Sequence, residues 1–213
     1  MKIPITLVFL ISVYITSGCQ ESKFSLGIAL CPTINSLYGN EFTRDIQDPR
    51  LSLFAGINAD YMLNNIFGIR TGMGFERKGN QAIVEFTTAT GEPAGQGKIK
   101  HNFDYLTVPI LIRFNTKQKI KFYFVAGPYI GFLVNRTNIV REETIDVKED
   151  FSTIDLGLHL GLGLLIPLSE KLELDVGLRE ELGLINTSEL PVYDDGAVRT
   201  NSFGVVFGLK CLL

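Results

Sequence analysis

The sequence has no tryptophan and only two histidines and three cysteines among its 213 residues. His101 and His159 are far apart and the cysteines are isolated, so no spacing typical of a metal site is present. We therefore expect no metal or other cofactor. The formal net charge is only −3, and no basic run is interleaved with aromatic residues. Nothing in this composition indicates binding of nucleic acid.

Long hydrophobic runs are also missing after residue 20, where no stretch has the eighteen or so apolar residues of a membrane helix. This absence excludes helical spans but not membrane strands, which are apolar only at alternate positions. Helical periodicity is missing as well, and apolar residues recur at every second position instead. The pattern therefore predicts strands.

The first residues form a segment of their own, "MKIPITLVFLISVYITSGCQ", with Lys2, an apolar run and then small residues. This order is typical of a secretory signal peptide. We expect residues 1–19 to be the signal peptide and residues 20–213 to be the mature domain. Two alternatives stay open at the junction, because cleavage after Cys19 leaves Gln20 first, whereas a lipobox would leave a lipidated Cys19.

The mature sequence divides into alternating segments joined by connections of two kinds. Short polar turns such as "NN", "TKQK" and "LSEK" alternate with long connections at 35–49, 79–101, 135–152 and 186–199. Short turns at one end and long loops at the other are typical of an outer-membrane barrel. The predicted fold is all-β, an eight-stranded antiparallel up-and-down transmembrane β-barrel. Its expected strands are 23–34, 50–63, 66–78, 102–115, 120–134, 153–167, 171–185 and 200–212.

Glycine indicates which face of each strand points inward. In "IDLGLHLGLGLLI" the aliphatic residues occupy one face, and Asp155, His159 and three glycines occupy the other. Fourteen of the 21 glycines fall on such non-aliphatic faces: 27, 56, 68, 72, 74, 127, 131, 157, 161, 163, 177, 183, 204 and 208. A face in water gains nothing from glycine, whereas a narrow lumen needs small residues opposite long ones. The aliphatic face is therefore predicted to meet lipid.

The other face then supplies a polar lumen of nearly balanced charge. Buried charges must pair, so we predict a structural cross-barrel network and no open pore. Lys78 also belongs to this inner face. Glu180 interrupts the alternating aliphatic residues of its strand, and we expect it at the rim of the barrel or at a β-bulge. Cys31 and Cys211 are expected to lie too far apart to form a disulfide. The network's expected members are Asp60, Arg70, Glu76, Arg113, Asp155, His159, Glu173, Asp175, Arg179, Glu181 and Lys210.

Catalysis has little support in the sequence. His159 and Asp155 share a face, and Ser25, Ser52 and Ser202 are nucleophile candidates by face only. No G-x-S-x-G elbow occurs. We expect a hydrogen-bonded lumen histidine and no enzyme.

Several stretches resemble the PorT-type outer-membrane β-barrel family of Bacteroidetes. The resemblance is carried by "FAGINADYMLNNIFGIRTGMGFERKG", "YLTVPILIRF", "FYFVAGPYIGFLV" and "DLGLHLGLGLLI". It covers nearly the whole mature chain and implies an eight-stranded barrel in the outer membrane, with a link to protein secretion. The C-terminal Leu213 departs from the aromatic ending common in such barrels, and no functional residue carries over.

The expected role is structural or interactive, through the long loops, in the outer membrane of a Gram-negative bacterium. Expected partners are outer-membrane lipid and other envelope or secretion proteins, and the chain is expected to be a monomer. Three alternatives remain open. These are a lipid-modifying barrel enzyme that uses His159 or His101, a narrow channel, and a soluble periplasmic barrel like a lipocalin.

Overall fold

The computed structural model describes residues 23–40, 48–88, 90–140, 143–192 and 196–213, so the predicted signal peptide and Cys19 lie outside the described residues. The described chain is almost entirely strand, with one 3₁₀ turn at Lys148–Asp150. No helix in these parts is long and apolar enough to span a membrane. The strands are β1 (Phe24–Tyr38), β2 (Asp48–Met62), β3 (Phe67–Thr87), β4 (Pro93–Asn115), β5 (Lys121–Val140), β6 (Glu143–Asp146), β7 (Ile154–Pro167), β8 (Leu172–Gly183) and β9 (Arg199–Leu212).

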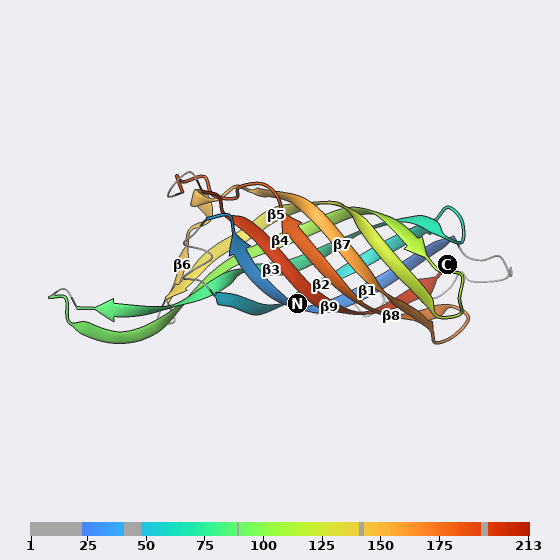
Figure 1. Ribbon diagram of the computed structural model, residues 1–213, viewed down its shortest axis with the longest axis horizontal. Coiled ribbons are helices and arrows are strands. Elements are labelled where there is room, and N and C mark those ends of the chain that lie inside the picture. Colours follow the sequence, from blue (N-terminus) through green and yellow to red (C-terminus); the bar gives the residue numbers. More distant parts are fainter. Residues whose placement is uncertain (1–22, 41–47, 89, 141–142, 193–195) are drawn as a thin grey trace, which may run out of the picture.

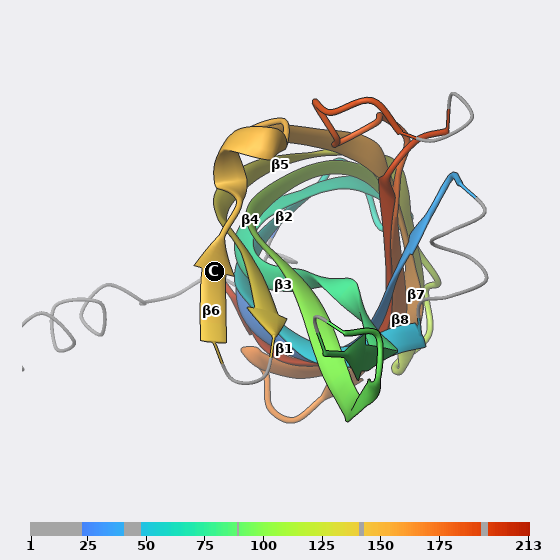
Figure 2. The same cartoon turned by 90° about the vertical axis from the view of Figure 1, so that its left-hand side faces the viewer.

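Eight of these strands close into a ring, as Figures 1 and 2 show. Each pairs antiparallel with its neighbours in the order β1, β2, β3, β4, β5, β7, β8 and β9, and β9 returns to β1. The short β6 adds to the outer end of β5 and is not part of the ring. The predicted eight-stranded up-and-down barrel is therefore confirmed.

The register fixes the tilt of the strands. A row of paired residues that starts at Phe24 passes through Ile112 and Glu180 and returns to β1 at Ile34, ten residues further along. Ten residues of stagger over eight strands correspond to a tilt of roughly 40°. Each residue then rises by about 2.5 Å along the barrel axis.

An aliphatic belt covers the outside of the barrel. On β7, Leu156, Leu158, Leu160 and Leu162 are 43–55% exposed. Asp155, on the opposite face of the same strand, is fully buried. The same alternation runs through β1, β2 and β3. Apolar carbon therefore faces outward and charge faces inward, the reverse of a soluble barrel, as the glycine pattern predicted.

The long connections differ from the prediction, because two of them are largely strand. In the predicted loop 79–101, β3 continues to Thr87 and β4 begins at Pro93, and together they form a ribbon that projects beyond the barrel (Figure 1). In 135–152, β5 continues to Val140 and pairs with β6. From Ile83 to Lys100 none of the described ribbon residues is buried, as the 61% exposure of Ile83 illustrates, so alternation cannot reveal this outer part of the ribbon.

One short turn is also longer than predicted. The connection between β2 and β3 comprises residues 63–66 and not only the two asparagines. The Asn64 side-chain oxygen accepts hydrogen bonds from the backbone N–H groups of Ile66 and Phe67, both at 2.9 Å. Asn64 thus closes the turn through its side chain.

Candidate functional site

Small residues on the inner face make room for the charged lumen. Gly163 on β7 lies opposite Gly177 on β8, and a Cβ added to Gly163 would stand 2.7 Å from the Gly177 Cα and 2.8 Å from the Tyr123 ring. Such distances leave no space for even a methyl group. Glycine at this pair therefore allows the Tyr123 ring to cross the interior.

A lower ionic network, nearer the short turns, is centred on Asp60. Its carboxylate accepts hydrogen bonds from Arg70, at 2.7 Å, and from Arg113, and it forms an ion pair with Lys210. Arg70 also lies 3.6 Å from Asp175, which accepts a hydrogen bond of 2.7 Å from the Tyr123 hydroxyl. At the short-turn end of the barrel, Glu173 pairs with Lys121 at 2.9 Å.

An upper ionic network lies nearer the ribbon and is centred on Glu181. Its carboxylate pairs with Arg179 at 2.5 Å, with Lys78 at 3.2 Å and with His159 at 3.0 Å. Arg179 reaches Glu76 at 3.1 Å, and Lys78 reaches Asp155 at 3.3 Å. The network thus joins β3, β7 and β8 across the interior, as buried charges require.

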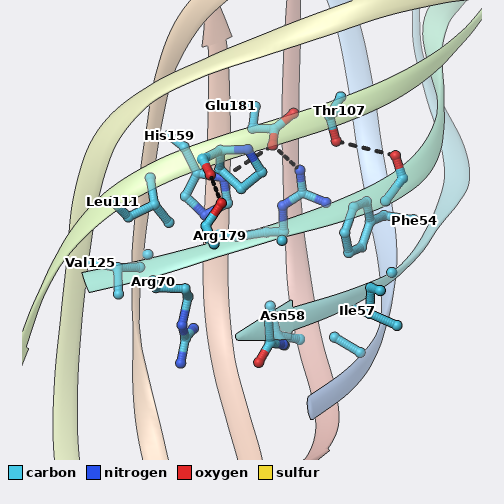
Figure 3. A pocket seen from close by; sticks show the side chains of 18 of the residues that line it. Phe54, Ile57, Asn58, Arg70, Thr107, Leu111, Val125, His159, Arg179 and Glu181 are labelled. Atoms are coloured by element: carbon cyan, nitrogen blue, oxygen red, sulfur yellow. Dashed lines mark hydrogen bonds and ion pairs between the residues drawn. The ribbon is translucent and has the colours of Figure 1, made fainter. Parts of the chain in front are cut away.

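A small cavity of about 60 Å³ separates the two networks. Phe54, Asn58, Leu111, Val125 and His159 are among the residues that line it (Figure 3). Figure 3 also shows Arg179 beside both Glu181 and the Phe54 ring, whose centroid is 4.0 Å from the guanidinium carbon. A volume of this size corresponds to a few water molecules and is too small for an organic substrate.

Aromatic and aliphatic side chains fill the upper end of the lumen. Phe103, Tyr105 and Leu133 are at most 5% exposed and pack together with Leu37. The Arg136 guanidinium carbon lies 4.0 Å from the Phe103 ring centroid and 4.5 Å from that of Phe151. Side chains therefore occupy the extracellular mouth of the barrel.

The structure places all of the expected lumen residues on the inner face and divides them between the two networks. The lower network holds Asp60, Arg70, Arg113, Glu173, Asp175 and Lys210, and the upper network holds Glu76, Asp155, His159, Arg179 and Glu181. Sequence reasoning missed the tyrosines. Tyr123 and Tyr129 donate hydrogen bonds to Asp175 and Asp155. Both tyrosines are an even number of residues from Gly127 and Gly131, and so lie on the same face of β5 as these glycines. This shared face is the signal that could have revealed them.

The candidate catalytic groups are not brought together. Ser25 donates a hydrogen bond to Asp60, and Ser202 donates one to Glu76, so neither hydroxyl contacts His159. Among the described residues, no group of three or more histidine, cysteine or acidic side chains could hold a metal ion. Cys31 and Cys211 are both free thiols.

A closed barrel with an aliphatic exterior, a charged interior and short turns at one end defines an outer-membrane β-barrel of a Gram-negative bacterium. Residues 18–189 match a family described as an outer membrane protein beta-barrel domain, and the chain belongs to this family.

Solved structures of other outer-membrane proteins have a similar fold. Neisserial surface protein A (NspA) superposes with a TM-score of 0.54 at 13% identity, over 90% of this chain and 98% of that one. Ail of Yersinia pestis gives 0.47 at 14% identity, over 90% and 99% of the two chains. OprG from Pseudomonas aeruginosa gives 0.45 at 14% identity, over 90% and 96%. A comparison with curated proteins found no match.

Proposed function

We propose that this barrel is a non-enzymatic interaction protein of the outer membrane and binds partners through its extracellular strands. The observation that carries the proposal is the ribbon formed by β3 and β4 beyond the barrel (Figure 1). Binding residues collect on exposed segments that a rigid scaffold holds in place. A barrel closed on all sides is such a scaffold.

The interior supports this role more than transport. Two ionic networks and a cluster of aromatic and aliphatic residues occupy the lumen, and the cavity between the networks holds only a few waters. The hydroxyls of Ser25 and Ser202 donate to carboxylates and not to His159, which supports a non-catalytic role. We propose that the chain acts as a monomer. We also propose a link to protein secretion, which its resemblance to PorT-type barrels implies.

Truncation of the ribbon tests this function. Gln81 and Lys100 are register partners, so residues 82–99 can be replaced by Asn-Gly, which favours a two-residue hairpin. We expect the truncated protein to keep its heat-dependent gel mobility. It should lose its crosslinked protein partners in living cells by at least tenfold, and secretion of exported proteins should fall.

The matched control replaces residues 117–119 in a short turn at the other end of the barrel with Gly-Ser-Gly. This control should retain the partners. Unchanged crosslinks and unchanged secretion after truncation of the ribbon would contradict the proposal. A changed lipid A in the wild type that reverts in His159→Ala would favour an enzyme instead.

A further inference from the structure

The lipid-facing surface formed by β7, β8 and β9 carries a carboxylate, that of Glu180. The register is continuous on both sides, with Glu180 opposite Leu160 on β7 and Phe203 on β9, so no bulge is present. Directly opposed residues share one face of a sheet. Leu160 and Phe203 are 46% and 43% exposed on the outer face, and Glu180 therefore points outward with them.

Glu180 lies in the upper part of the apolar belt, toward its rim. It stands eight residues above Leu172, the first residue of β8 at the short-turn end. At a rise of about 2.5 Å per residue, this places it roughly 20 Å up a belt that is about 25 Å tall. An unpaired ionisable side chain on the lipid-facing surface is rare even near the edge of the belt, and it points to a functional contact.

Nothing in the described chain satisfies this carboxylate. The described hydrogen bonds and ion pairs of the side chains do not include Glu180. On the neighbouring strand, Asn201 lies opposite Leu182 on the same outer face, and its Oδ1 atom is shielded from solvent without a hydrogen-bond partner. Glu180 and Asn201 are diagonal neighbours on the sheet, about 7–8 Å apart. We call these two residues the outer polar patch.

The charge of Glu180 limits which molecule can bind at the outer polar patch. A second copy in the same membrane has the same orientation and so offers its own side chains at matching depths. The outward Arg77 is already paired with Asp104 at 2.5 Å, and Arg199 lies four residues above Phe203, about 10 Å nearer the headgroups. Arg77 is therefore occupied and Arg199 lies above Glu180, so neither arginine of a second copy complements the patch.

We propose that the outer polar patch docks another integral outer-membrane protein, which presents a lysine or arginine to Glu180. A charged pair shielded from water by both proteins fixes their register and orientation. This inference deepens the proposed interaction role and rests on it. It assigns a lateral contact within the membrane in addition to the extracellular one.

Photocrosslinking in the native outer membrane tests the docking site. A photoreactive amino acid replaces Leu178, two residues below Glu180 on the same outer face, in the full chain. The control position is Met73, on the outer face of β3 at the far side of the ring. We expect an adduct between the Leu178 position and an outer-membrane protein, and none of that mass from the Met73 position.

The adduct should depend on the charge of Glu180. We expect Glu180→Gln and Glu180→Leu each to reduce it at least tenfold while the heat-dependent gel mobility stays intact. Glu180→Lys should also abolish the adduct. In the Glu180→Lys background, a lysine-to-glutamate or arginine-to-glutamate change at the crosslinked surface of the identified partner should restore the adduct.

Four outcomes would overturn the proposal: an adduct to lipid alone, an adduct to a second copy, a protein adduct that persists in Glu180→Leu, or no protein adduct. The two proposals fail separately. An intact Leu178 adduct with no effect of ribbon truncation would refute only the extracellular role. Loss of partners on ribbon truncation without a Leu178 adduct would refute only the lateral site.

Discussion

Removal of Arg179 should destabilise the barrel more than removal of an arginine on its outer surface. Arg179 pairs with Glu76 at 3.1 Å and with Glu181 at 2.5 Å, and all three side chains are at most 4% exposed. In Arg179→Met, Glu181 keeps Lys78 and His159, but Glu76 keeps only the Ser202 hydroxyl. Breaking a buried ion pair in this way costs about 3–5 kcal/mol.

A loss of about 3–5 kcal/mol lowers the ratio of folded to unfolded protein by a factor of roughly 10² to 10³ or more, because about 1.4 kcal/mol is a factor of ten. The matched control is Arg77→Met, which removes the pair with Asp104 at 2.5 Å. The Arg77 side chain is 42% exposed but that of Asp104 is only 6% exposed, so the expected loss is about 1–3 kcal/mol, the cost of leaving one buried polar group without its partner.

Urea titration in lipid vesicles measures both losses. The folded fraction is read from the gel mobility of unboiled samples, because the chain has no tryptophan to report unfolding by fluorescence. Glu76→Gln in the Arg179→Met background should recover part of the loss, since it removes the uncompensated charge. Equal losses for Arg179→Met and Arg77→Met would refute the view that paired charges hold the interior together.

Four further predictions concern the lumen, the ribbon and the thiols. The wild type should be silent in planar bilayers, and steady conductance would show that the lumen is not filled. Burial lowers the pKa of His101, at the base of the ribbon, below its usual 6.5, so folding favours the neutral form of His101. Stability should therefore fall as the pH drops below about 6.5, where the opened state binds the proton more readily than the folded state. The protection factors of the ribbon amides, which correct for the intrinsic pH dependence of amide exchange, should be lower at pH 5.5 than at 7.5. His101→Asn should remove most of that difference, and an unchanged pH effect in the variant would assign it to another group. Gly163→Ala should abolish the heat-shifted folded form, whereas Gly91→Ala, whose Cβ meets nothing within 4 Å, should keep it despite about 1–2 kcal/mol of backbone strain at φ +86°. The fully buried Cys31 should resist maleimide until the barrel unfolds, and non-reducing gels should show no bond to Cys211.

The barrel could be predicted because its sequence signal is periodic. Every membrane strand has one face in lipid and one in a crowded lumen, so aliphatic residues such as Leu158 alternate with residues such as Gly157 and Asp155. The odd or even position of a charged residue in its strand predicts whether its side chain faces the lumen or the lipid, even when its ion-pair partner is unknown. The eleven expected lumen residues therefore lie on the inner face in the structure.

Pairings and strand ends could not be predicted in the same way. The partner of Arg179 depends on the ten-residue stagger of the ring, which places Glu76 beside it from a distant strand. None of the described ribbon residues from Ile83 to Lys100 is buried, so no periodic signal marks its outer strands. Glu180 violated the alternation, and only the continuous register of β8 shows that it faces lipid.

The cross-barrel pairs have a consequence for the order of folding. Arg179 and Glu76 are 103 residues apart in the chain, and Ser202 and Glu76 are 126 apart. A partly assembled sheet that lacks β8 and β9 would hold Glu76 and Lys78 without the partners that those strands supply. Such charges are costly in hydrocarbon, so an unfinished sheet gains little from entering the membrane. The charged interior thus delays insertion of the sheet into the membrane until β9 pairs with β1. Ring closure and membrane insertion then become a single late event.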